Sequence, residues 1–294
     1  MEYTSSSDKI TRDYFDSLLL ESRYIDSDLP STKLELYGRT FDTPVMTAAL
    51  SHLGNTAENG MVKYAQAAAK ANAVHWVGMG EDKELEEITA TGAATIKIIK
   101  PHADNKEVFR KIEHAKKAGC FAVGMDIDHA FNGSGGYDNV LGLDMKPKST
   151  EELHDFVEAA EIPFIVKGVL STKDAEKCLK AGCKGIQLSH HHGIMQYAVP
   201  PLMMLPEILQ VTRGEIPVFI DCGIESGMDV YKCLVLGATA VSVGRHLMPL
   251  LKEGADATAA RIKEMTGELA ATMARTGVRD LKNFDPTVIH QRRF

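Results

Sequence analysis

Hydrophobic residues along the chain occur in short runs that alternate with longer amphipathic stretches rich in alanine. The runs are four to six residues long and contain mostly Val, Ile, Phe and Ala; they lie at 44–48, 73–78, 95–99, 121–126, 163–167, 185–189, 217–221 and 240–243. Apolar runs of this length, bounded by Gly, Pro and polar residues, are typical of buried strands in a parallel sheet. We therefore expect eight strands.

Helical periodicity fills the intervals between these runs. It predicts helices at 61–71, 83–91, 106–118, 150–159, 172–181, 201–212 and 227–236, followed by an apolar C-terminal helix around 255–273. Several of them end in Gly, which is the residue preferred just beyond a helix end. Strands and helices that alternate through 294 residues predict a (β/α)₈ TIM barrel that forms one domain over residues 1–294.

An open, doubly wound sheet is the second interpretation of the same alternation. It is disfavoured because no G-x-G-x-x-G motif follows the first predicted strand.

Two segments lie outside the repeating pattern. Residues 1–32 form an N-terminal extension with no clear element. Residues 126–148 are rich in Gly and Asp, with Gly-Ser-Gly-Gly at 133–136, and form the one long predicted loop. Long loops after barrel strands are usually lids or binding loops, so we expect 126–148 to border the active site.

Composition and charge narrow the class of partner. The net charge of −7 and the absence of a Lys/Arg-rich run give no electrostatic footprint for nucleic acid or an anionic membrane, so a small molecule is the expected partner. Residues 1–12 are polar and unlike a signal peptide, and no stretch of about 20 apolar residues occurs. The five cysteines contain no C-x-x-C pair. We expect a cytoplasmic protein without disulfides.

Polar side chains gather where the predicted strands end. In a barrel this is the C-terminal face, where active sites are found. The residues are Asp126, Asp128, His129, Lys167, Ser189, His190, His191, His192, Asp221, Gly244 and Arg245.

The last two predicted strands carry a candidate phosphate site. Their sequences read IPVFIDCGIESG and ATAVSVGRHL. The phosphate site of a barrel is frequently formed by this pair of loops, where glycines let backbone N–H groups approach the anion and an arginine adds charge. Gly223, Gly244 and Arg245 are the predicted phosphate ligands.

Lys167 and the three consecutive histidines allow more than one chemistry. An ammonium at the end of an apolar strand is a Schiff-base nucleophile or a cation beside a bound anion. One histidine suffices for a general base, whereas His190 and His192 with Asp126, Asp128 and His129 offer ligands for a divalent metal.

Taken in order, these residues resemble the FMN-dependent α-hydroxy-acid oxidase and dehydrogenase family, which includes glycolate oxidase, lactate oxidase and mandelate dehydrogenase. The resemblance runs from about Lys33 to Asp280. IPFIVKGVLSTKDAEKCLKAGCKGIQLSHHHG is similar to the family's LPVLVKG and VSNHGG motifs, and IPVFIDCGIESGMDVYKCLVLGATAVSVGRHL is similar to its IPVFLDGG and GRP motifs.

The resemblance implies a role for each matching residue. His191 is the implied base, Asp128 orients it, and Lys167 stabilises negative charge on the reduced flavin. The implied cofactor-binding residues are Ala48, Ala49, Lys97, Asp126, Lys167, Ser189, Asp221, Gly223, Gly244 and Arg245. No metal is implied, and the family suggests a homotetramer.

Several positions depart from the family pattern. Ile194 stands where the family has its substrate-binding arginine, and Glu225 stands where it has a phosphate-contacting arginine. Lys97 and Lys100 lie near the usual Gln and Tyr of the third strand, and Asp126 replaces a threonine. We expect the family's N-terminal helical region, which brings a substrate tyrosine, to be missing, so that the chain is an N-terminally short member.

Three hypotheses follow. The leading one is an FMN-dependent oxidoreductase that acts on a small 2-hydroxy acid or related carbinol. The second is a metal-dependent hydrolase or lyase on the same barrel. The third is a flavin-binding barrel that has lost hydroxy-acid chemistry, as the replacements Ile194 and Glu225 suggest.

Overall fold

The computed structural model describes residues 5–292, and within them eight strands form one parallel sheet. The strands are β4 (Val45–Thr47), β5 (His75–Val77), β6 (Thr95–Ile99), β7 (Ala122–Asp126), β10 (Phe164–Val169), β11 (Gly185–Leu188), β12 (Val218–Ile220) and β13 (Ala240–Val243). Each coincides with one of the eight predicted runs, so this part of the sequence prediction is confirmed.

The sheet closes on itself. Its strand order is β4-β13-β12-β11-β10-β7-β6-β5, which leaves β4 and β5 at the two ends. These two strands are joined by the Thr47 amide, which donates to the Val74 carbonyl at 3.1 Å, and by the Gly78 amide, which donates to the Leu50 carbonyl at 2.8 Å. The result is the predicted (β/α)₈ barrel, in which all eight strands end at the same face.

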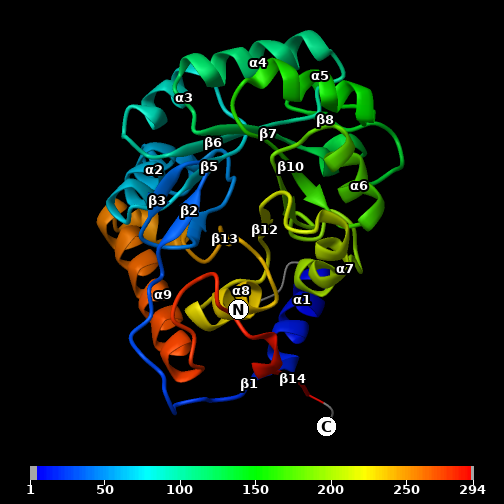
Figure 1. The fold of residues 1–294 in the computed structure, drawn as a ribbon. Helices are drawn as coiled ribbons and strands as arrows, with labels where there is room; N and C mark the ends of the chain where they lie inside the picture. The colour runs from blue at the N-terminus through cyan, green and yellow to red at the C-terminus, as the bar shows by residue number, and fades with distance from the viewer. Residues whose placement is uncertain (1–4, 293–294) are drawn as a thin grey trace.

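Helices surround the strands in a ring (Figure 1). One follows each strand: α2 (Gly60–Lys70), α3 (Asp82–Thr89), α4 (Asn105–Lys117), α5 (Thr150–Ala160), α6 (Thr172–Lys180), α7 (Pro201–Thr212), α8 (Gly227–Val235) and α9 (Ala255–Arg275). Side-chain caps fix several starting points. Ser149 forms a full capping box with Glu152, and Ser171 and Ser226 cap α6 and α8.

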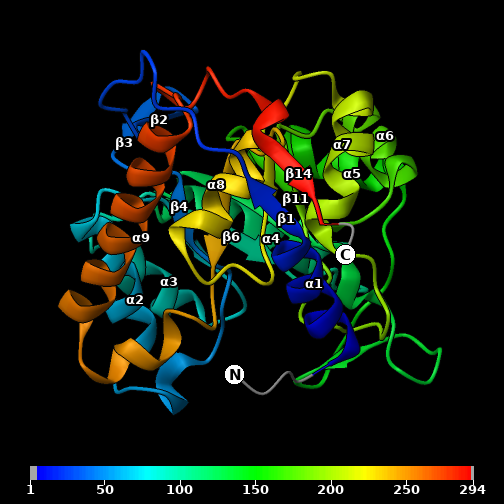
Figure 2. The same cartoon turned by 90° about the horizontal axis from the view of Figure 1, so that it is seen from below.

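Two layers of apolar side chains hold the barrel together. The outer layer lies between strands and helices, and the inner layer fills the barrel around Trp76 and Phe219, whose rings pack edge to face at 5.4 Å. The hairpin of β2 (Leu34–Leu36) and β3 (Arg39–Phe41) adds side chains to the inner layer and covers the N-terminal end of the barrel (Figure 2).

The N-terminal segment contains a helix and a strand that the sequence pattern did not indicate. Helix α1 (Ser6–Ser17) begins at the Ser5 cap, and β1 (Leu18–Leu20) pairs antiparallel with β14 (Ile289–Gln291) near the end of the chain. Helix α1 lies beside α7 and α8, with its first turn at the C-terminal face of the barrel (Figure 2).

The long loop is ordered by its own hydrogen bonds. It contains the 3₁₀ turn η2 (Ile127–Ala130) and a small hairpin of β8 (Asn139–Val140) and β9 (Leu143–Asp144). A bridge between His102 and Met145 ties its far end to the loop after β6. The remaining short turns are η1 (Leu53–Asn55), η3 (Met248–Lys252) and η4 (Pro286–Val288).

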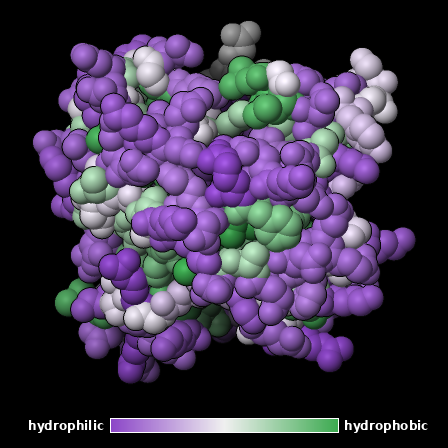
Figure 3. Space-filling model, turned by 90° about the horizontal axis from the view of Figure 1, so that it is seen from above, coloured by the Kyte–Doolittle hydropathy of each residue, from purple (hydrophilic) through white to green (hydrophobic). Residues whose placement is uncertain are grey.

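The surface over α3, α4 and α5 is mostly hydrophilic, with apolar side chains in separate spots (Figure 3). Among the helices described, none combines the length and apolarity needed to cross a bilayer. All five cysteines are buried and unpaired in this part of the chain.

Candidate active site

The ends of β7, β10, β11 and β12 bring four polar side chains together at the C-terminal face. Asp126 and Lys167 are register partners on neighbouring strands, and the Lys167 ammonium lies 3.5 Å from an Asp126 oxygen. Lys167 also donates to the Ser189 hydroxyl at 3.3 Å, and it lies 3.9 Å from Asp221. All four side chains are buried, so their charges interact through a medium less polarisable than water.

Lys100 joins this group from the end of β6. Its ammonium donates to Asp126 Oδ2 at 2.8 Å. Burial alone would raise the pKa of Asp126, but Lys167, His191 and Lys100 together lower it well below its ordinary value. The pKa of Lys167 is raised, because the carboxylates of Asp126, Asp128 and Asp221 outweigh its burial. Both strand-end residues are therefore ionised at neutral pH.

His191 lies above these charges and is oriented by a second carboxylate. Its Nδ1 lies 3.1 Å from Asp128 Oδ1 and 3.4 Å from Asp126 Oδ2. Gly168 makes room for this arrangement: its φ is +94°, and a Cβ there would lie 2.8 Å from Asp128 Oδ2. A side chain at position 168 would thus push Asp128 away from the histidine.

His191 and His192 have strained backbone conformations, and this strain orients the His191 ring. His191 and His192 both have positive φ, at 47° and 54°. The Ser189 hydroxyl accepts the His191 amide at 3.1 Å and holds this turn. Non-glycine residues in the left-handed region cost free energy and are concentrated at functional sites.

The protonation of His191 and Asp128 is linked. Burial and the Lys167 charge oppose a proton on His191, but hydrogen bonds and charge from Asp126 and Asp128 raise its pKa above the ordinary value. Burial, followed by the charge of Asp126, raises the pKa of Asp128 to about 6. A pair that shares protons in this way can accept one from a bound molecule near neutral pH.

A second histidine, His129, contacts the first. Its Nε2 lies 3.1 Å from His191 Nε2, and its Nδ1 lies 3.2 Å from Asp138 Oδ2 on the long loop. The sequence indicated His129 only as a metal ligand, and Asp138 was not singled out. No sequence signal indicates Asp138, because only the folded conformation of the long loop brings it to His129, which lies nine residues earlier in the chain.

The loops after β12 and β13 form the other half of the mouth. Gly223, Gly244 and Arg245 line one small cavity of 50 Å³ together with Ser242 and His246, so the predicted phosphate residues do converge. Glu225, the residue that replaces an arginine, lines the same cavity.

Helix α1 packs over these loops, which sequence reasoning missed. Asp8 accepts a hydrogen bond from Arg245 at 2.7 Å. Arg12 forms a two-armed ion pair with Asp229 of α8 and also donates to the Gly223 carbonyl at 3.0 Å. Gly223 has a φ of +75°, and a Cβ there would lie 2.7 Å from Thr11, so the loop needs glycine to fit under α1.

The remaining predicted cofactor residues divide into two groups. Ala48 and Ala49 follow β4, and the Ala48 amide donates to the Val243 carbonyl at the end of β13, next to Gly244. Lys97 lies elsewhere. Ile96 and Ile98 face the barrel interior, so Lys97 faces the helices, where its ammonium donates to the Gly78 carbonyl. The geometry gives no support to Lys97 as a cofactor ligand.

The structure also tests whether the candidate metal ligands lie together. His190 is bound to Thr11 of α1 at 2.8 Å and His192 lies near Asp8, so neither joins the carboxylates. Asp126, Asp128, His129 and His191 do offer ligand atoms within 4.8 Å of one another. However, the ammonium groups of Lys100 and Lys167 already neutralise Asp126, and they would repel a divalent cation from this cluster.

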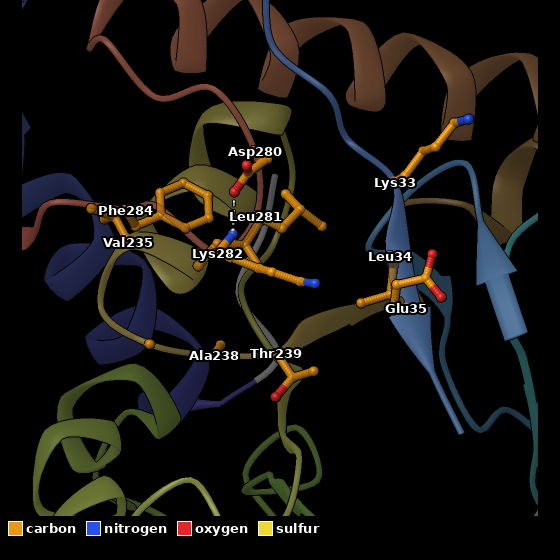
Figure 4. Close-up of a pocket in the computed structure, with 12 residues that line it drawn as sticks. Lys33, Leu34, Glu35, Val235, Ala238, Thr239, Asp280, Leu281, Lys282 and Phe284 are labelled. Carbon is orange, nitrogen blue, oxygen red and sulfur yellow. Dashed lines mark hydrogen bonds between the residues drawn. The ribbon is translucent and has the colours of Figure 1, made fainter. Parts of the chain in front are cut away.

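A larger cavity of 590 Å³ lies far from this chemistry. Its lining includes Lys33 and Glu35 of the β2 region and Asp280, Leu281 and Lys282 near the C-terminus (Figure 4). These residues lie at the N-terminal end of the barrel, where barrel enzymes do not place their catalytic groups. Cavity size therefore does not locate the active site here.

Comparison with known proteins agrees with the geometry. The FMN-dependent dehydrogenase family matches residues 3–155 and 144–291, which together cover nearly the whole chain. The chain belongs to this family.

Its relatives share about a quarter of its residues. It is 24% identical to the 2-hydroxyacid oxidase of Dictyostelium discoideum, over 97% of this chain and 84% of the relative. It is 28% identical to the L-lactate oxidase of Lactobacillus jensenii, over 88% and 72% of the two chains. It is 26% identical to the glycolate oxidase of Spinacia oleracea, over 92% and 84%.

Comparison with solved structures points to the same family. A mandelate oxidase determined with a monooxide FMN adduct superposes with a TM-score of 0.86 at 27% identity, covering 95% of this chain and 90% of that one. A mandelate oxidase with 2-hydroxy-phenylacetamide superposes with a TM-score of 0.88 at 25% identity, over 99% and 91%. The protein is an FMN-dependent oxidoreductase.

The residues of the mouth fit this cofactor. Arg245 and the backbone of two glycines provide donors for a phosphate on one side. On the other side the buried Lys167 ammonium offers positive charge at the barrel axis, as an electron-rich ring system requires. Glu225 adds negative charge to the phosphate half, and Arg261 lies near it, donating to the Glu225 backbone carbonyl at 3.0 Å.

Proposed function

We propose that this FMN-dependent oxidoreductase oxidises a small 2-hydroxy acid to the corresponding keto acid, with His191 as the base. The observation that carries the proposal is the Asp128–His191 pair, held 3.1 Å apart directly beside the Lys167 ammonium. The relatives named above are oxidases of hydroxy acids, which supports the same substrate class.

Each residue has a defined task in this scheme. His191 Nε2 takes the hydroxyl proton of the substrate, because Nδ1 is engaged by Asp128. Asp128 fixes the ring and stabilises the imidazolium that forms. FMN, when bound, accepts the electron pair of the substrate C–H bond. Lys167, held by Asp126 and Ser189, presents positive charge to the site while this happens.

The substrate carboxylate needs a cationic partner, and we assign Lys100 to this role. Ile194 replaces the arginine that the family uses, and its half-exposed side chain brings no charge. Lys100 is the nearest alternative, since its ammonium reaches the mouth and contacts only Asp126 among the described residues. A lysine binds a carboxylate as a point charge and not through a two-pronged fork, so selection for small acids should be looser than with arginine.

The test compares acids with uncharged analogues. Glycolate, L-lactate and mandelate are assayed beside their primary amides, with wild type, Lys100→Met and the control Lys146→Met on the long loop. We expect turnover of at least one acid, and about 10- to 100-fold lower kcat/KM in Lys100→Met only, because one charge-assisted contact is lost. Equal rates for acids and amides would contradict carboxylate recognition.

One further candidate function rests on the departures at Ile194 and Glu225. A flavin-binding barrel without hydroxy-acid chemistry would keep FMN tightly and leave it oxidised with every acid tested. The same assay therefore separates this candidate from the proposed oxidoreductase.

We also propose that the protein is cytoplasmic and works as a homo-oligomer, with a tetramer as the expected state. The unpaired, buried cysteines and the absence of a basic patch in the sequence support the first statement. Family membership supports the second. Light scattering on the purified FMN-loaded protein measures the oligomer directly.

A further inference from the structure

His129 and His191 face each other through their ring nitrogens at the mouth of the barrel. The two Nε2 atoms are 3.1 Å apart, and the rings are nearly perpendicular, with centroids separated by 4.4 Å. At this distance one nitrogen carries the proton and the other accepts it. The contact joins two side chains that are 62 residues apart in sequence.

The neighbours of the two rings decide where the protons lie. His191 Nδ1 lies 3.1 Å from Asp128, 3.4 Å from Asp126 and 3.2 Å from the Lys167 ammonium. The ammonium is held by Asp126 and Ser189, and the two carboxylates keep the proton on Nδ1. Asp138 accepts at His129 Nδ1, so that nitrogen is protonated too. His129 Nε2 is then a lone pair, and it accepts the proton of His191 Nε2 when His191 is an imidazolium.

The contact connects the base to a carboxylate of the long loop. The side chains of His191, His129 and Asp138 are 28%, 20% and 21% exposed, whereas the Asp126 carboxylate beneath them is 4% exposed. The loop holds Asp138 in place, because the Asp138 amide donates to the Ala130 carbonyl and its own carbonyl accepts from Met145. Asp138 is thus a fixed carboxylate at the edge of solvent.

We propose that His129 and Asp138 form a relay that returns the proton of His191 to solvent after each turnover. This inference rests on the proposed function, since it requires His191 to have taken the substrate proton. When product has left, the proton on His191 Nε2 moves to His129 Nε2. The proton on His129 Nδ1 moves to Asp138 and then to water, so that His191 is neutral again and His129 has changed tautomer without gaining charge. When the next substrate displaces His129, its Nε2 proton passes to water and Nδ1 regains a proton from water through Asp138, which restores the starting tautomer.

The charges around His129 favour this exchange of tautomers over storage of a proton. His129 faces Lys100, His191, Asp126 and Asp138. Burial, followed by the charges of Lys100 and His191, lowers its pKa to about 4. The ring is therefore neutral at neutral pH and passes a proton on at one nitrogen as it receives one at the other. His129 acts through His191 and is a positioning residue.

The relay and the substrate use the same side of the base. His129 Nε2 lies where the substrate hydroxyl must lie to reach His191 Nε2. Substrate binding displaces His129, and product release allows it to return. The relay is consequently connected only when no substrate occupies the base.

The first test needs no substrate. At a pH below the His191 pKa, where the ring is an imidazolium, histidine-ring ¹⁵N spectra of the FMN-loaded protein measure how fast the His191 Nε2 proton exchanges with water in wild type, Asp138→Asn and the control Asp144→Asn on the same loop. We expect exchange to slow about 100-fold in Asp138→Asn, at the lower end of the contribution of a positioned acid–base group, and to stay unchanged in Asp144→Asn. Equal exchange rates in all three proteins would overturn the relay.

The second test follows turnover. After anaerobic mixing with whichever of glycolate, L-lactate or mandelate bleaches the wild-type flavin, an indicator dye records proton release and absorbance records bleaching. In wild type the two signals coincide. In His129→Gln and Asp138→Asn we expect release to lag behind bleaching, and kcat to fall further than kcat/KM. Added imidazole should restore the release rate in His129→Ala.

The outcomes separate the two proposals. Proton release in step with bleaching in both variants, or equal losses in kcat and kcat/KM without imidazole rescue, would leave His129 with a structural role only and would overturn the relay. Failure of every acid to bleach the wild-type flavin would count against the proposed function, and the exchange measurement would then decide the relay by itself.

Discussion

The two ends of the barrel are closed by different kinds of side chain. At the N-terminal end the β2–β3 hairpin inserts Leu34, Leu36 and Phe41, all at least 96% buried, into the inner apolar layer. At the C-terminal end the same depth is occupied by Asp126 and Lys167, which are equally buried but charged. The N-terminal end therefore stabilises the fold, and the C-terminal end provides the catalytic groups.

Free energy explains the division. Burying an apolar side chain contributes about 25 cal/mol per Å², so the hairpin end stabilises the fold directly. Burying an ion pair gains little, because the cost of removing both charges from water offsets their attraction. A network of Lys100, Asp126, Lys167 and Asp128 therefore persists for its function and not for stability. Substitutions at the two ends should have opposite consequences.

The largest expected effect is at the charged end. His191→Ala should lower kcat about 100- to 10,000-fold, because the base is removed, while the FMN content and the folding midpoint stay close to wild type. Rapid-reaction absorbance with a reactive 2-hydroxy acid measures the rate. His154→Ala on α5 is the matched histidine control. A variant that still reduces its flavin at the wild-type rate would remove His191 from the mechanism.

A substitution at the apolar end should lower stability and leave catalysis unchanged. Phe41→Ala removes a ring that packs edge to face on Phe121 at 5.6 Å, and it should lower the free energy of unfolding by about 3–5 kcal/mol. The kcat/KM of the folded fraction should not change. Urea unfolding of the FMN-loaded protein provides the measurement. A loss of activity without loss of stability would break the comparison between the two ends.

A substitution in the phosphate half of the mouth should weaken cofactor binding and leave the chemical step unchanged. Arg245→Met removes a charged donor and should weaken FMN binding about 10- to 100-fold. Fluorescence titration of the FMN-free protein measures the dissociation constant. Arg39→Met at the opposite end removes the same charge and should leave it unchanged. Equal affinities in the two variants would place the phosphate elsewhere.

The smallest expected effect is on the pH dependence of kcat/KM. His191 must be neutral to act as the base, and its folded pKa is raised. The kcat/KM profile should therefore rise with pH through a midpoint above the ordinary histidine value of about 6.5. Asp128→Asn removes a group that raises this pKa, so the midpoint should move down. An unchanged midpoint would show that Asp128 does not set the protonation of His191.

The barrel could be predicted from the sequence because its strands are continuous apolar runs. Helix α1 could not, since three of its four buried residues, Ser7, Asp8 and Thr11, are polar, and Phe15 alone gives no apolar periodicity to detect. These residues are buried because they bind Met195, Arg245 and His190, which are contacts that only the folded chain provides.

The candidate site was predictable in part for the same reason. The positions of Lys167, Ser189 and His191 follow from strand ends and family motifs. Lys97 faces the helices, because Ile96 and Ile98 occupy the inner face of β6; the strand is buried on both faces, and its sequence does not tell which face looks inward. The contact of His129 with Asp138 depends on the path of the long loop, which no periodicity encodes.

The most direct test of the account is an anaerobic titration of the FMN-loaded wild-type protein with glycolate, L-lactate and mandelate, followed by flavin absorbance and keto-acid analysis. The account predicts that at least one acid bleaches the flavin, with one keto acid formed per flavin. A protein that binds FMN but remains yellow with every 2-hydroxy acid would contradict it.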